Sequence, residues 1–169
     1  MNRKGFSLLE LLMSVAIFSM VCVVIFYVYQ MGINNWDIIS VQSHLAGEAR
    51  MGMERMSKEL RTSNLSNIDT SSATQFRFKI PTAVNSTTGV ISTWSNWIRY
   101  SRGGVGGNQL LRTDEGTNAA TVLANEVTGI QFTLTSNPST VSILMTTQKA
   151  ASDGTLIPIA LTGTVELRN

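Results

Sequence analysis

An uncharged apolar run near the N-terminus constrains this chain more than any other feature. Residues 11–29 hold 19 successive positions without Asp, Glu, Lys or Arg. A helix rises about 1.5 Å per residue, so the run would extend roughly 28 Å, close to the ~30 Å hydrocarbon core of a bilayer. The run therefore predicts one membrane-spanning helix.

The basic residues around the run predict its orientation. Arg3 and Lys4 precede it, and the next Lys or Arg is Arg50. This asymmetry places the N-terminus in the cytoplasm and the rest of the chain across the membrane. A cleaved secretory signal peptide is the alternative, but its apolar region is usually only about 7–15 residues long. The segment after the run, QMGINNWD, also lacks a clean small-residue cleavage site, which favours an uncleaved anchor.

The helical pattern continues beyond the apolar run. Apolar or small residues recur every three or four positions, at Ile38, Val41, Leu45, Ala49, Met53, Met56 and Leu60. This spacing predicts an amphipathic helix. We expect one helix over residues 6–61, with Gly32, Asn34 and Asn35 as its weakest points because these residue types are poor helix formers.

The period changes to two after residue 74. Alternation predicts strands in the segments TQFRFKI, VTGIQFTLTS, TVSILMTT and IPIALTGTVELRN. The segments SNWIRYS and QLLRT flank RGGVGGN and predict a hairpin, which brings the total to about six strands. The predicted fold class is therefore α+β, with a long N-terminal helix whose first half is embedded in the membrane. The amphipathic half over residues 31–61 packs on an antiparallel β-sheet domain over residues 62–169, because each needs an apolar partner.

Composition excludes several kinds of site. No Lys/Arg stripe with interleaved aromatic residues indicates nucleic-acid binding. The single Cys22 and single His44 cannot build a zinc site of ordinary composition, and no cofactor is expected. His44 lies off the apolar stripe, and RGGVGGN lacks the context of a phosphate loop. Asp114, Glu115 and Asn118 offer oxygen ligands for Ca²⁺, but an ordinary polar turn is favoured. The chain is not expected to be an enzyme.

The sequence does not decide the role of two tryptophans. Trp94 and Trp97 lie three positions apart in a segment rich in Ser and Asn. They are either core residues or contact residues.

Glu10 stands just before the apolar run and needs an explanation. An ionisable residue deep in a membrane costs roughly 2.5–3.5 kcal/mol and is a functional hypothesis by default, although a position near one end costs less. One explanation is local, because Ser7 and Glu10 fit the S-x-x-E pattern of a capping box. A carboxylate also suits the positive end of the helix dipole.

The residues before Glu10 suggest a second explanation. The sequence KGFSLLE, after a short basic leader and before an apolar helix, resembles the processing site of type IV prepilins and type II secretion pseudopilins. The resemblance implies that residues 1–5 are a leader cut after Gly5 and that Phe6 becomes the methylated N-terminus. It also implies that Glu10 pairs with the Phe6 amine of a neighbouring subunit. Residues 6–30 would then form the membrane half of the helix.

The same resemblance implies partners and a location. The partners are a prepilin peptidase that is also the methyltransferase, other pilin or pseudopilin subunits, an inner-membrane assembly platform and membrane lipid. The chain would span the bacterial inner membrane once, with a periplasmic C-terminal domain, and would then enter a filament.

Looser resemblances point to a branch of the family. ERMSKELRTS, WIRYSRGGVGGNQLLRTDEG, VLANEVTGIQFTL and GTVELRN look like minor pilins and J-type pseudopilins. The chain has no proline before Pro81 and one cysteine, whereas major pilins often have a proline in the membrane helix and a C-terminal disulfide. A subunit of a secretion pseudopilus and one of a type IV pilus both fit. A single-pass membrane-anchored periplasmic binding or sensing domain is the alternative.

Overall fold

One long helix opens the described part of the chain. The computed structural model describes residues 7–72, 74–137 and 139–168. Helix α1 runs through Leu8–Leu60, its 53 residues unbroken at Gly32, Asn34 and Asn35. The weak points suggested by propensity therefore do not break the helix, because intrinsic propensity has only a weak influence on where a helix ends. By contact density the chain forms two compact units, Met1–Ser40 and Val41–Asn169.

Ten strands follow the helix in the described residues. They are β1 (Ile68–Ser72), β2 (Gln75–Phe78), β3 (Pro81–Val84), β4 (Ile91–Trp94), β5 (Ile98–Gly103), β6 (Gln109–Asp114), β7 (Ala119–Ala124), β8 (Val127–Ser136), β9 (Ser139–Ala150) and β10 (Leu156–Glu166). Two short 3-10 helices, η1 (Leu65–Asn67) and η2 (Val105–Gly107), lie between them.

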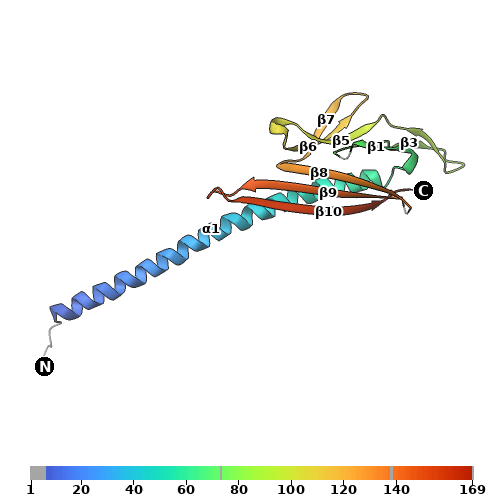
Figure 1. Ribbon diagram of the computed structural model, residues 1–169. Helices are drawn as coiled ribbons and strands as arrows, with labels where there is room; N and C mark the ends of the chain where they lie inside the picture. The colour runs from blue at the N-terminus through green and yellow to red at the C-terminus, as the bar shows by residue number, and fades with distance from the viewer. Residues whose placement is uncertain (1–6, 73, 138, 169) are drawn as a thin grey trace. The chain divides into compact units, whose positions relative to one another are not determined.

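All the strand pairs are antiparallel and form three sheets. The orders are β1-β2-β5-β6-β7, β10-β9-β8 and the hairpin β3-β4. Figure 1 shows β8, β9 and β10 side by side as one layer and the β5–β7 region as another. The predicted α+β class, a long apolar N-terminal helix followed by antiparallel sheets, is confirmed. This is a pilin-like arrangement.

The prediction of about six strands was too low. It contained β2, β5, β6, β8, β9 and β10 but missed β1, β3, β4 and β7. These four strands are short and mostly exposed or half-buried. Because they have no fully buried face, their sequences need not alternate between apolar and polar residues. Strand β2 also ends at Phe78, so Ile80 lies in the link to β3 and contacts the core from there.

The core lies where the two larger sheets meet the second half of α1. Phe76 from β2 stacks on Phe132 from β8, with ring centroids 4.9 Å apart, so the sheets share one apolar interior. Phe78 stacks on Tyr100 at 5.2 Å. As the alternation predicted, Phe76 and Phe78 are buried whereas Gln75 is exposed.

The helical stripe supplies the other side of this core. Its buried members are Leu45, Ala49, Gly52, Met56 and Leu60. Four of them were predicted, and Gly52 was not, because a glycine carries no apolar signal. A Cβ at Gly52 would lie 3.3 Å from Cβ of Ala124 and 3.5 Å from the carbonyl oxygen of Leu123. Glycine thus allows the helix to approach β7 closely.

The end of α1 is closed locally. The Thr62 hydroxyl donates to the Glu59 carbonyl oxygen at 2.7 Å, and the Ser63 amide donates to the Leu60 carbonyl oxygen. The Arg168 amide then donates to the Ser63 carbonyl oxygen at 3.0 Å. The C-terminal segment is therefore fastened to the helix end.

We predict that residues 30–169 fold without the N-terminal segment and that Leu45→Asp destabilises them strongly. Leu45 is fully buried, and an uncompensated buried charge costs about 3–5 kcal/mol. Met51→Asp is the matched control, since Met51 lies on the same helix and is 72% exposed. Urea unfolding of the three proteins measures the effect. Equal midpoints for Leu45→Asp and Met51→Asp would contradict the packing described above.

Candidate functional site

The first turn of α1 places Ser7 and Glu10 at the start of the apolar segment. The Ser7 carbonyl oxygen accepts hydrogen bonds from the Glu10 and Leu11 amides at 3.0 and 3.1 Å. The Ser7 hydroxyl oxygen accepts one from the Leu9 amide at 3.3 Å. Ser7 therefore caps the helix through its own side chain.

The Glu10 carboxylate takes no part in this cap. Within the described residues it accepts no hydrogen bond and forms no ion pair, so the reciprocal half of the expected capping box is absent there. Glu10 is exposed in the first helical turn, where a negative charge suits the helix dipole. The local explanation of Glu10 thus reduces to the dipole effect, worth about 0.3–1 kcal/mol.

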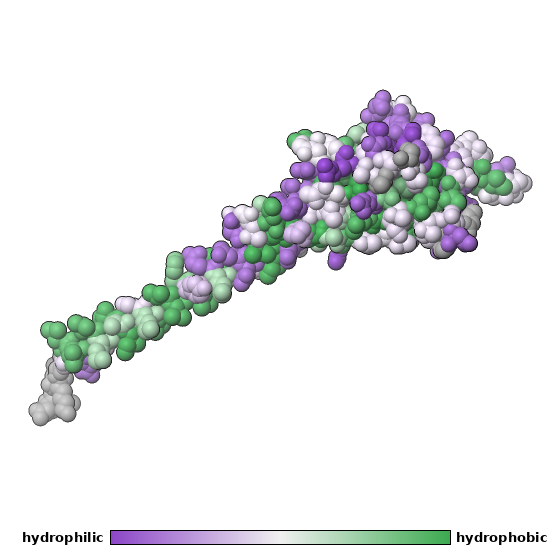
Figure 2. All heavy atoms as spheres, viewed as in Figure 1, coloured by the Kyte–Doolittle hydropathy of each residue, from purple (hydrophilic) through white to green (hydrophobic). Residues whose placement is uncertain are grey.

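The segment that follows Glu10 exposes its apolar side chains. Apart from the half-buried Ile38, the large apolar residues from Leu8 to Ile39 are each between 46% and 81% exposed. Figure 2 shows a mostly hydrophobic surface over the N-terminal part of α1, with hydrophilic patches farther along the helix. Among the described residues, α1 is the one helix with the length and composition to cross a membrane. Cys22 lies in this segment and is exposed.

The two residues predicted to be processed are Gly5 and Phe6. Gly5 and Phe6 lie outside the described residues. The separation of Phe6 from Glu10 therefore rests on the sequence alone.

A comparison with protein-family models identifies the N-terminus. Residues 1–26 match the prokaryotic N-terminal methylation motif. The matched range contains Gly5, Phe6 and Glu10, and it ends within the exposed apolar segment. The N-terminus is that of a type IV prepilin-like protein. No curated protein and no solved structure matches the chain significantly.

The methylation motif indicates a general role. Such a motif implies processing by a prepilin peptidase and assembly with other pilin subunits. The apolar helix fits anchoring in a membrane. Proteins of this class are generally structural and not enzymatic.

Other residues singled out in the sequence have ordinary structural surroundings. Nε2 of His44 lies 3.8 Å from Oε1 of Glu48, one helical turn away. RGGVGGN forms the β5–β6 hairpin connection with η2, and no helix of the kind a phosphate loop needs follows it. Trp94 is half-buried. The Trp97 ring lies under the cations of Arg77 at 5.2 Å and Lys79 at 4.8 Å.

The polar turn after β6 uses its carboxylates internally. Oδ1 of Asp114 accepts hydrogen bonds from the Gly116 and Thr117 amides at 2.9 and 3.3 Å. Glu115 pairs with Arg77 through a short contact and with Arg99 at 3.6 Å. Asn118 takes a positive φ of 56°, a conformation that asparagine tolerates in turns. This geometry is that of a turn tied to the neighbouring strands.

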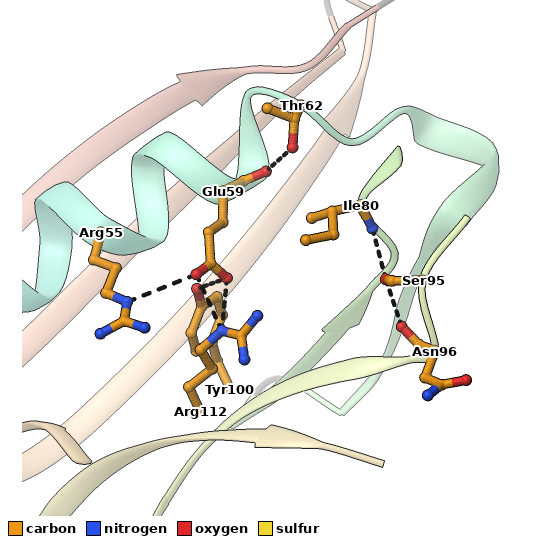
Figure 3. Close-up of polar contacts among 8 residues, drawn as sticks. All are labelled: Arg55, Glu59, Thr62, Ile80, Ser95, Asn96, Tyr100 and Arg112. Carbon is orange, nitrogen blue, oxygen red and sulfur yellow. Dashed lines mark hydrogen bonds and ion pairs between the residues drawn. The ribbon is translucent and has the colours of Figure 1, made fainter. Parts of the chain in front are cut away.

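One polar cluster was not predicted from the sequence. Glu59, near the end of α1, accepts a hydrogen bond from the Tyr100 hydroxyl at 2.8 Å (Figure 3). Its two carboxylate oxygens share the Nε–H of Arg112, at 2.9 and 3.0 Å. Nε of Arg55 lies 3.7 Å from Oε1 of Glu59. The Glu59 and Arg112 side chains are only 19% and 18% exposed. The only local clue was an arginine four residues before Glu59.

Burial and the Glu59 charge shift the pKa values of two residues in this cluster, Tyr100 and Arg112. Burial raises the pKa of the Tyr100 phenol, and the charge of Glu59 and their hydrogen bond raise it further. Burial lowers the pKa of Arg112, but the hydrogen bond with Glu59 and its charge more than compensate, so the net shift is upward. The cluster fixes the end of α1 to β5 and β6.

A cleft of about 660 Å³ lies beside the cluster. Its lining residues are Met51, Glu54, Arg55, Lys58, Glu59, Thr62, Ile80 and Pro81. The Glu59 carboxylate is already occupied by Tyr100 and Arg112. Among the described residues, no three His, Cys, Asp or Glu side chains lie together as metal ligands would.

We predict that Glu59→Gln lowers the free energy of unfolding of residues 30–169 by about 1–3 kcal/mol, because the poorly solvated Arg112 loses its counter-charge. Glu54→Gln is the control, since Glu54 is exposed on the same helix. Denaturant unfolding of both variants tests this. Similar losses for the two would show that the cluster contributes no more than a surface charge.

Proposed function

We propose that the chain is a minor pilin or pseudopilin subunit that is inserted singly in a bacterial inner membrane and then built into a filament. The observation that carries the proposal is the combination within residues 1–26: a methylation motif, Glu10 in the first helical turn, and an exposed apolar helix. An apolar surface of this extent needs lipid or other helices around it. The membrane supplies lipid before assembly, and the filament supplies the helices of neighbouring subunits afterwards.

The proposed processing and division of the chain follow the motif. The peptidase removes residues 1–5 by cutting after Gly5, and the new amine on Phe6 is methylated. Residues 6–30 form the membrane half of the helix, residues 31–61 the amphipathic periplasmic half, and residues 62–169 the periplasmic sheet domain.

Glu10 is the proposed assembly residue. When subunits stack, its carboxylate pairs with the Phe6 amine of a neighbour, so two charges that are costly in an apolar setting compensate each other. The absence of any described partner for the Glu10 carboxylate within its own chain supports this role. A capping function would instead have engaged it locally.

The proposed position in the filament is the tip or the initiating complex. The resemblance of residues 54–63 and of the β5–β6 region to minor pilins and J-type pseudopilins supports a minor subunit of a type II secretion pseudopilus or a type IV pilus. The sheet domain would make the lateral contacts.

Fractionation of the native host tests the proposed function. We expect the processed chain in the inner membrane and a small amount in sheared or cross-linked filaments with other pilin-like subunits. Deletion of its gene should reduce filament number or secretion. A chain found solely as an uncut membrane protein, with normal filaments in the deletion strain, would favour an anchored periplasmic binding or sensing domain.

A further inference from the structure

The exposed apolar surface of α1 extends beyond the apolar run of residues 11–29. Past Tyr29, the side chains of Ile33, Trp36 and Ile39 are 46%, 76% and 58% exposed. The next exposed large apolar residue on the helix is Met51, and Leu45 before it is fully buried. The exposed apolar surface of the helix therefore ends near Ile39, about three turns beyond Tyr29, and Trp36 is its most exposed member past Tyr29.

The composition of this extension is mixed. Gln30, Asn34 and Asn35 alternate with apolar residues, and Asp37 follows Trp36 directly. Tyr29, Ile33 and Trp36 are spaced by four and three residues, so they lie on one face of the helix. Tryptophan favours the boundary between hydrocarbon and water, because its ring is apolar and its N–H needs a partner.

We propose that Trp36 lies at the headgroup level of the periplasmic leaflet and thereby holds Glu10 at the headgroup level of the cytoplasmic leaflet. Glu10 and Trp36 are 26 positions apart, which is about 39 Å along a helix. A bilayer with its headgroup regions is about 40–45 Å thick, of which ~30 Å is hydrocarbon. Both residues therefore fall in opposite headgroup regions at once. This inference rests on the proposed function.

This depth changes how the Glu10 charge is accommodated before assembly. At the headgroup level the carboxylate keeps its water, so the inserted subunit does not bear the cost of a charge in hydrocarbon. The carboxylate enters an apolar setting only when the subunit leaves the bilayer for the filament. There the amine of a neighbour is available to it.

The competing placement centres residues 11–29 in the hydrocarbon. Tyr29 would then mark the periplasmic boundary, and Trp36 would lie about 10 Å farther out, in water. A third possibility is that Trp36 contacts another protein and neither lipid nor water.

Tryptophan fluorescence in vesicles distinguishes these placements. The chain has three tryptophans, so Trp94→Phe with Trp97→Phe leaves Trp36 as the sole reporter. The full-length variant is reconstituted at a low protein-to-lipid ratio in phosphatidylethanolamine and phosphatidylglycerol vesicles. We expect quenching to be strongest with lipids brominated close to the headgroup and weak with lipids brominated near the chain end. Aqueous acrylamide should quench only partly.

A second reporter separates failure of the depth assignment from failure of insertion. In the same Trp94→Phe, Trp97→Phe background, Phe26→Trp combined with Trp36→Phe places the sole reporter nearer the expected bilayer centre, where chain-end bromines should quench it most. Deep quenching at Phe26→Trp with no lipid quenching of Trp36 would overturn the depth assignment alone. Shielding of Trp36 from both lipid and acrylamide would overturn it in favour of a protein contact. No lipid quenching of either reporter would contradict membrane insertion itself.

A cysteine variant keeps the test independent of the two replaced tryptophans. Cys22→Ser with Trp36→Cys leaves one cysteine in the full-length chain. We expect slow labelling by a membrane-impermeant maleimide, in contrast to rapid labelling of Met51→Cys in the Cys22→Ser background. Equal rates would place position 36 in water and contradict the proposal.

Discussion

Replacing Glu10 by glutamine is expected to abolish most filament incorporation while leaving insertion and cleavage unchanged. Ser7 caps the helix through the Leu9 amide, and the Glu10 carboxylate is not needed for that bond. The substitution therefore preserves the start of α1 and removes only the charge. If Glu10 pairs with the Phe6 amine of a neighbour, the variant leaves that amine charged and unpaired among apolar helices, which is strongly unfavourable.

The measurement is the ratio of filament-bound to membrane-pool subunit, taken together with secretion or piliation. Glu10→Asp should be intermediate, because it keeps the charge with a shorter reach. Ser7→Ala is the matched control, since it removes the cap but keeps the carboxylate. If Glu10→Gln assembles as well as the unmodified chain, the pairing role is wrong and the carboxylate acts only on the helix dipole.

Replacing Gly5 by leucine is expected to leave an uncut precursor that accumulates in the membrane. The proposed cleavage bond joins Gly5 to Phe6, and a branched side chain there would crowd a peptidase site suited to a very small residue. Without cleavage there is no amine at Phe6, so assembly should be lost as well. The shift in mass on immunoblots measures cleavage, and Gly5→Ala is the conservative control. Normal processing of Gly5→Leu would place the cut elsewhere.

Much of the fold could be predicted because burial imposes a period on the sequence. Leu45, Met56 and Leu60 recur at helical spacing and are fully buried. Phe76 and Phe78 alternate with polar residues, and both belong to the core. The apolar N-terminal segment was equally readable, because a bilayer requires a long uninterrupted run.

The features that the sequence could not predict depend on contacts between distant segments. Strand β7 has an exposed, Ala- and Thr-containing sequence, and only its pairing with β6 makes it a strand. Glu59 meets Arg112 across 53 positions, which no local spacing reveals. Gly52 is important because a β-strand passes close to it, not because of any property of its neighbours in sequence.

The candidate site was predicted in part, and its signal was a misplaced charge and a motif instead of a burial pattern. Glu10 was conspicuous because a charge interrupts the start of an apolar helix, and the methylation motif covers it. The capping-box expectation held only in that Ser7 caps the helix. Its hydroxyl accepts a hydrogen bond from the Leu9 amide and not from the Glu10 amide, and the Glu10 side chain does not fold back onto Ser7 among the described contacts. Local sequence does not determine which of two nearby donors a short side chain selects.

Mass analysis of the N-terminus of the protein extracted from native membranes tests the central claim most directly. We expect a chain that begins at Phe6 and carries one methyl group on its amine. An intact Met1 start in unmodified cells would contradict prepilin processing. A start near residue 30 would identify the apolar segment as a removed signal peptide and leave Glu10 with no role in the mature protein.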